Sequence, residues 1–226
     1  MRMTMLLAAV LCAVTSRATS ADDNTPTRRD KPMTVAILVF EGVELLDFAG
    51  PAEVFAVADY GRSFKVVTVS KSTQPLRTMG GIRVTPDYRY DDAPQPDIVV
   101  VPGGAMTNAG EGATRWIKHA AGKADAVMSV CMGAFLLADA GLLSGIEATT
   151  HRWGIQGLRS AAPKCKVVSG RRFVDSGKIV TTAGVSAGID GALHLVERFY
   201  GKPAAEWTAN EWMEYRRPTQ DKSPSE

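Results

Sequence analysis

One cysteine of this sequence lies in surroundings suited to nucleophilic chemistry. A short apolar run over residues 126–130 leads directly into Cys131, and an apolar segment with Gly133 near its start follows. This order predicts a strand, a tight turn that carries the cysteine, and a helix. Because the helix dipole stabilises a thiolate at a helix N-terminus, we expect a lowered pKa and a charged sulfur near neutrality. The position also suits a small buried apolar residue, so a structural role for Cys131 stays open.

Two other segments place groups that such a nucleophile needs. Gly103 and Gly104 end the apolar strand expected over residues 97–101, and their amides can approach a developing negative charge closely. An ordinary strand-ending turn is the alternative. Asp47 lies between two apolar residues, where a carboxylate is costly to bury unless it is paired or protonated. Its alternative role is to cap the helix that contains Pro51.

The remaining cysteines and histidines are few and scattered. His151 follows a short strand of apolar and threonine residues and is a candidate base for a Cys–His pair with Cys131. The alternatives are that it faces the substrate or that it supports the residues that do. Cys165 lies in a polar stretch and is expected to be exposed or at a strand start. Three cysteines and three histidines suit neither a disulfide scaffold nor a zinc module, so we expect no metal and no cofactor.

The elements that position these residues alternate between short apolar strands and amphipathic segments. Strands are expected over residues 35–40, 64–69, 97–101 and 126–130, hairpins over 79–85 and 171–182, and helices over 46–58, 114–122, 132–143, 186–199 and 204–215. This alternation predicts an α/β fold with a mostly parallel sheet sandwiched by helices. Aromatic residues of the last helix are expected to pack in the core or on a dimer surface.

The first 21 residues have the layout of a secretory signal peptide. A positive start is followed by an apolar run that ends at residue 14, then by small residues and a polar stretch. That run is too short to span a membrane, and Leu11 argues against lipidation at Cys12. We therefore expect a signal peptide (1–21), a linker (22–33), one domain (34–217) and a flexible tail (218–226), with export to the periplasm or the exterior.

The composition is that of an ordinary globular protein. The chain has 226 residues, 45% of them hydrophobic and 22% charged, with a formal net charge of +2. Two of its 26 Lys and Arg residues, Arg2 and Arg17, lie in the leader, which leaves 24 against 24 Asp and Glu residues. Without a net positive charge or a helix-turn-helix segment, we expect no nucleic-acid partner, and no membrane partner after signal cleavage.

Taken in order along the chain, these segments resemble the ThiJ/PfpI superfamily of class I glutamine-amidotransferase-like proteins. The matching stretches are residues 40–43, 47–55, 100–104, 131–143, 148–151 and 182–190. They are most similar to isonitrile hydratases and to the amidotransferase-like domains of AraC-type regulators. The resemblance implies a flavodoxin-like fold with a nucleophile elbow, and it implies a small-molecule substrate and a homodimer.

The resemblance also implies roles for individual residues. Cys131 takes the place of the nucleophile, and Asp47 that of the acidic residue that hydrogen-bonds the thiolate and moves the proton. The amides of Gly104 and Met132 are implied to line an anion site. Met132 is a departure, because hydratases resembling this sequence carry a threonine after the cysteine, and methionine has no hydroxyl to donate.

Three functions are compatible with these residues. The first is an exported enzyme that adds water to a small electrophile, such as an isonitrile or a reactive carbonyl, through Cys131 and Asp47. The second is a non-enzymatic domain that binds a small ligand. The third is a redox sensor in which the Cys131 thiolate is oxidised.

Overall fold

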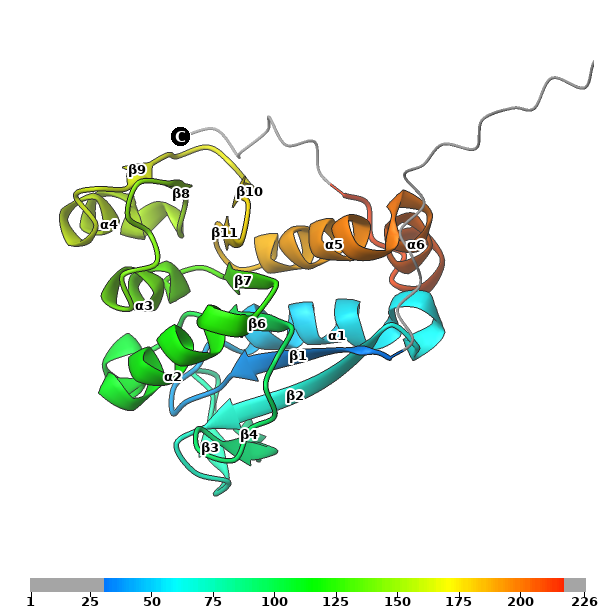
Figure 1. The fold of residues 1–226 in the computed structure, drawn as a ribbon, viewed down its shortest axis with the longest axis horizontal. Coiled ribbons are helices and arrows are strands. Elements are labelled where there is room, and N and C mark those ends of the chain that lie inside the picture. The colour runs from blue at the N-terminus through cyan, green and yellow to red at the C-terminus, as the bar shows by residue number, and fades with distance from the viewer. Residues whose placement is uncertain (1–30, 218–226) are drawn as a thin grey trace, which may run out of the picture.

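A seven-stranded sheet forms the centre of the computed structural model, which describes residues 31–217 (Figure 1). The strand order is β10-β11-β7-β6-β1-β2-β5, and only the edge strand β10 runs antiparallel to its neighbour. The strands are β1 (Met33–Leu38), β2 (Phe64–Ser70), β5 (Tyr88–Arg89), β6 (Ile98–Val101), β7 (Ala126–Ser129), β10 (Phe173–Ser176) and β11 (Ile179–Thr182). The predicted α/β fold with a mostly parallel sheet is therefore confirmed.

Helices cover both faces of this sheet. They are α1 (Leu45–Gly61), α2 (Gly110–Lys123), α3 (Gly133–Asp139), α4 (Ile155–Ala161), α5 (Ala187–Tyr200) and α6 (Lys202–Trp207). Helices α1 and α5 pack against each other on one face, and α2 and α3 pack on the other (Figure 1). Every residue of the central strands β6 and β7 is buried, as expected for parallel strands covered on both sides.

Three predicted helices differ from the observed ones. Helix α1 begins at Leu45 with Glu44 at its N-cap position. Asp47 therefore lies in the first turn and does not cap the helix, and Pro51 lies inside the helix and not in its first turn as predicted. Helix α3 ends at Asp139, before the predicted end at residue 143, because Gly141 turns the chain with a φ of 75°. The last predicted helix is divided into α6 and the π-helical turn η3 (Thr208–Trp212).

Short elements without a strong sequence pattern were not predicted. They are β5, helix α4 and the 3₁₀ turn η2 (Arg152–Gly154). The strand expected before His151 is present as β8 (Glu147–Ala148), and the strand start expected at Cys165 as β9 (Lys166–Val167). The hairpin predicted near residue 80 is present as β3 (Leu76–Arg77) and β4 (Arg83–Val84). The predicted signal peptide, most of the predicted linker and the predicted tail lie outside the described residues.

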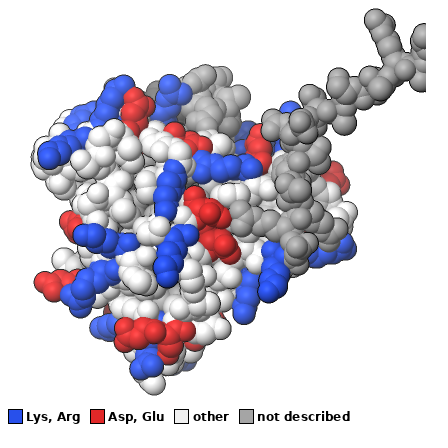
Figure 2. Space-filling model, viewed as in Figure 1, with Lys and Arg blue, Asp and Glu red and all other residues white. Residues whose placement is uncertain are grey.

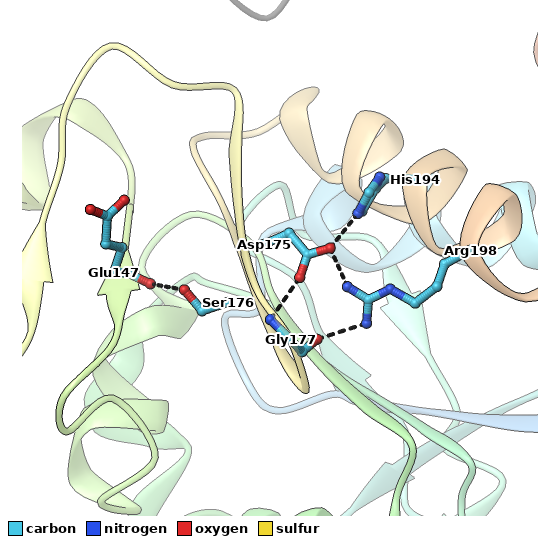
Figure 3. Close-up of polar contacts among 6 residues, drawn as sticks. All are labelled: Glu147, Asp175, Ser176, Gly177, His194 and Arg198. Carbon is cyan, nitrogen blue, oxygen red and sulfur yellow. Dashed lines mark hydrogen bonds and ion pairs between the residues drawn. The ribbon is translucent and has the colours of Figure 1, made fainter.

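A polar cluster ties the β10–β11 hairpin to helix α5 (Figure 3). The Asp175 carboxylate contacts His194 Nε2 at 2.7 Å and also pairs with Arg198, both from α5. Burial opposes ionisation of Asp175, but Arg198 and His194 outweigh it and lower its pKa. Ser176 donates instead to the carbonyl of Glu147, so the cluster does not form a Ser–His–Asp triad. The cluster therefore joins the hairpin to α5 and lies away from the elbow at Cys131.

Candidate active site

The residues singled out by the sequence meet where three parallel strands end. Asp47 comes from the start of α1 after β1, Gly103 follows β6, and Cys131 follows β7. Strands β1, β6 and β7 are neighbours in the sheet, so their carboxyl ends lie at one edge. The chain leaves β1 toward β2 on one side and reaches β6 on the other, which makes this edge the switch point where α/β sheets bind ligands.

Cys131 occupies a strained turn between β7 and α3. Its φ is 56°, in the left-handed region that residues with a side chain rarely adopt, as the predicted nucleophile elbow requires. The Cys131 N–H donates to the Ala183 carbonyl at 3.0 Å, and its own carbonyl accepts from Thr150 Oγ1 at 2.6 Å. These hydrogen bonds to two other segments hold the turn in place. Cys131 is largely buried, with 8% of its surface exposed.

Gly133 is required for this turn, and its replacement with alanine is expected to destabilise the fold. A Cβ at Gly133 would lie 2.0 Å from the carbonyl oxygen of Val101, a backbone atom that cannot move aside cheaply. We expect the Gly133→Ala variant to lose about 3 kcal/mol or more of unfolding free energy, measured by urea denaturation. Gly122→Ala is the control, because nothing lies within 4 Å of a Cβ there. Equal urea midpoints for both variants would contradict this account of the elbow.

Asp47 is fully buried beside the cysteine. Its Oδ2 accepts from the Gly103 N–H at 2.9 Å, while Oδ1 has no hydrogen-bond partner within residues 31–217. Burial raises the pKa of Asp47 to about 7, against the Gly103 hydrogen bond that lowers it, and the charge of Glu44 adds to the increase. The carboxyl group therefore exchanges its proton near neutral pH, as a general base or acid must.

The Cys131 thiol has the opposite pKa shift from the one predicted. Burial, followed by the charge of Asp47, raises its pKa to about 12, and the hydrogen bond from the Met132 amide lowers it less. The prediction of a thiolate near neutrality is therefore wrong for the free protein, because desolvation outweighs the N-terminus of a seven-residue helix. The proton rests on sulfur, and Asp47 lies next to it as an acceptor.

Gly103 and Gly104 bring backbone close to this pair. A Cβ on Gly103 would lie 2.8 Å from the Met132 nitrogen and 2.9 Å from Asp47 Oδ2, so only glycine fits. Gly104 has a φ of 138° and bridges to Val43 in the loop after β1. That the amides of Gly104 and Met132 form an anion site remains a prediction.

His151 lies near the elbow but is not paired with Cys131 in the described part of the chain. Its ring packs on Gly184, where an added Cβ would meet His151 Cδ2 at 1.9 Å. Its Nδ1 accepts from the Trp153 N–H at 3.3 Å, which caps turn η2. Burial and then the charge of Arg152 lower the pKa of His151, so the ring is neutral at pH 7. This geometry argues against a Cys–His pair, and His151 instead lines the cleft beside the elbow.

A cleft of about 750 Å³, which sequence reasoning missed, lies beside the elbow. It is lined by residues 149–152, 169–172 and 183–186 and by parts of α1 and α4. These segments are distant in sequence and two of them are loops, so no local pattern indicates the cleft. Within residues 31–217, no group of three His, Cys, Asp or Glu side chains is placed to hold a metal ion. The same residues include no helix long and apolar enough to span a membrane.

Comparisons with a family model and with other sequences point to the same family, and solved structures share its fold. Residues 33–198 match the DJ-1/PfpI family. An isonitrile hydratase of Pseudomonas putida is 33% identical over 177 residues, which cover 77% of this chain and 75% of that enzyme. The HTH-type transcriptional regulator GbdR of Pseudomonas aeruginosa is 27% identical over 182 residues, which cover 78% of this chain and 49% of the regulator. The crystal structure of a ThiJ/PfpI family protein from Pseudomonas syringae has the same fold, with a TM-score of 0.75 at 24% identity over 93% of this chain and 87% of that one.

Proposed function

The chain belongs to the DJ-1/PfpI family, and we propose that it is a cysteine-dependent enzyme that hydrates a small isonitrile to an N-substituted formamide. The observation that carries this proposal is the buried pair at the switch point. Cys131 lies on a strained turn, and Asp47, with a pKa of about 7, lies against its thiol. The similarity to the isonitrile hydratase supports the choice of substrate.

The first step uses the proton that rests on sulfur. As the Cys131 sulfur bonds to the terminal carbon of R–N≡C, Asp47 takes the thiol proton and delivers it to that carbon. The product is a thioimidate, Cys–S–CH=N–R, with no net change in protons. Since the thiol pKa is raised to about 12, this transfer must accompany the attack, and a base beside the sulfur is essential.

The second step consumes water. Asp47, again ionised, takes a proton from a water molecule as the water oxygen adds to the thioimidate carbon, and it passes this proton to nitrogen. The carbon–sulfur bond then breaks as Asp47 transfers the proton of the added hydroxyl group to sulfur, which releases R–NH–CHO and restores the thiol. The hydrogen bond from the Met132 amide stabilises negative charge on the departing sulfur.

Methionine at position 132 is compatible with this chemistry because the backbone amide makes the contact to sulfur. The Met132 side chain points instead toward Gly154, where a Cβ would meet its Sδ at 2.7 Å. A hydroxyl donor at this position is therefore not used in the proposed steps. We further propose that the enzyme acts after export and as a homodimer.

A turnover assay tests the proposal. The protein is incubated with methyl isocyanoacetate, and ¹³C NMR follows the loss of the isonitrile carbon and the appearance of the formamide. We expect stoichiometric conversion with many turnovers per protein molecule. Saturable binding without any formamide would contradict the enzyme and favour a ligand-binding domain, the alternative that the similarity to GbdR supports.

A further inference from the structure

The charged residues that line the cleft beside the elbow are all arginines. They come from turn η2, from α4 and from the loop before β10, and no Asp or Glu lines the cleft (Arg152, Arg159, Arg171 and Arg172). In Figure 2, Lys and Arg side chains predominate over the end of the molecule formed by α4 and β9. Because basic and acidic residues are equal in number after the predicted leader, this concentration is local.

The cleft and the reactive pair share a wall. Thr150 lines the cleft and donates to the Cys131 carbonyl at 2.6 Å, and Ala183 lines it and accepts from the Cys131 N–H at 3.0 Å. Leu46, also in the lining, directly precedes Asp47. A molecule in this cleft therefore lies against the backbone that presents the nucleophile.

Arg152 and Arg159 have positive charges that no carboxylate in residues 31–217 pairs with. Arg172, by contrast, is neutralised by the buried carboxylate of Asp190, whose Oδ2 lies 2.8 Å from its Nε. Arg159 makes only a long 3.4 Å hydrogen bond to a backbone carbonyl, and Arg152 lies 5.6 Å above the Trp153 ring. Neither has a carboxylate partner within residues 31–217. An anion bound in the cleft therefore meets two guanidinium groups whose charge is not already paired.

We propose that Arg152 and Arg159 bind a carboxylate of the substrate, so that the substrate class is a small electrophile that carries an anionic group. Guanidinium groups suit this role because they donate two parallel hydrogen bonds to a carboxylate. Leu46, Ile155 and Val185 give the cleft an apolar wall for the rest of the molecule. Its volume is within the range of small-molecule sites. The reaction of this substrate rests on the proposed function, whereas the anion site itself does not.

Alkylation of Cys131 tests the anion site without any turnover. Iodoacetate and iodoacetamide both transfer a CH₂ carbon to sulfur with loss of iodide. Iodoacetate carries a carboxylate, whereas iodoacetamide carries a neutral amide. Peptide mass spectrometry gives the rate of each at Cys131. We expect the iodoacetate-to-iodoacetamide rate ratio to fall about fivefold in the Arg152→Gln, Arg159→Gln double variant, and to fall with added salt in the wild type. The matched control, Arg83→Gln on β4, should keep the wild-type ratio.

A matched pair of isonitriles separates this inference from the proposed function. We expect kcat/KM for isocyanoacetate, relative to its neutral methyl ester, to fall about fivefold in the double variant. Unchanged ratios in both assays would overturn the inference, even if both isonitriles are hydrated. A lower alkylation ratio without hydration of either isonitrile would support the anion site and contradict the proposed function.

Discussion

Replacement of Cys131 with serine is expected to lower kcat/KM for isonitrile hydration by about 10⁴-fold or more. A serine hydroxyl is a much weaker acid than a thiol, and Asp47, with a pKa of about 7, cannot deprotonate it as it attacks. The two side chains are close in size, so the free energy of unfolding should change by about 1 kcal/mol or less. Steady-state kinetics and urea denaturation of the same preparation measure the two effects.

The matched control for this variant is Cys165→Ser. Cys165 is half-buried just before β9, and burial raises its pKa, but it does not line the site at the switch point. The control variant should retain full activity. If Cys131→Ser kept its activity, or if both variants lost it equally, the elbow cysteine would not be the nucleophile.

The sequence predicted the elements and residues that depend on local patterns. The apolar run into Cys131, the glycines after β6 and the isolated Asp47 each indicated a position at the end of a strand, and the structure places all three at the same sheet edge. The apolar neighbours of Asp47 also indicated a carboxyl that must be paired or protonated when buried, and burial does raise its pKa to about 7. Local patterning suffices here because parallel strands align their carboxyl ends.

Properties that depend on distant packing could not be predicted. The pKa of Cys131 is set by the burial that surrounding elements impose, which a strand–turn–helix pattern does not reveal. The arginine cleft combines loops that lie far apart in sequence, and Arg172 is distinguished from Arg159 only by its contact with Asp190. His151 was a candidate base by residue type, but the structure seats its ring against Gly184.

Replacement of Asp47 with asparagine is expected to lower kcat/KM by about 10²- to 10⁴-fold, because the amide cannot accept the thiol proton. In the wild type, kcat/KM should rise with pH and level off above an apparent pKa of about 7, since Asp47 must be ionised to act as the base. The variant should lose this pH dependence. The hydrogen bond from the Gly103 N–H is retained by the asparagine carbonyl, so the variant should keep the fold. A wild-type profile that Asp47→Asn leaves unchanged would assign the titration to another group.

The same substitution should stabilise the protein above neutral pH. Burial raises the pKa of Asp47 from 3.8 to about 7, so the folded state binds its proton more tightly than the unfolded state. The wild type therefore loses unfolding free energy as pH rises from about 4 to about 7, on the order of 4 kcal/mol, and the neutral asparagine does not. We expect Asp47→Asn to unfold at higher urea than the wild type at pH 8, and the difference to shrink toward pH 4.

The control for this stability effect is Asp175→Asn, for which the expected change in unfolding free energy has the opposite sign. Arg198 and His194 outweigh burial and lower the pKa of Asp175, so its ionised form stabilises the folded state above the unfolded pKa, and this contribution is lost as pH falls. The control should be less stable than the wild type at pH 8. A stabilisation by Asp47→Asn that is equal at pH 4 and pH 8 would show that burial of an ionised Asp47 is not its source. The predicted combination, lower activity with higher stability at pH 8, follows because the low-dielectric position that tunes Asp47 as a base also opposes its charge in the fold.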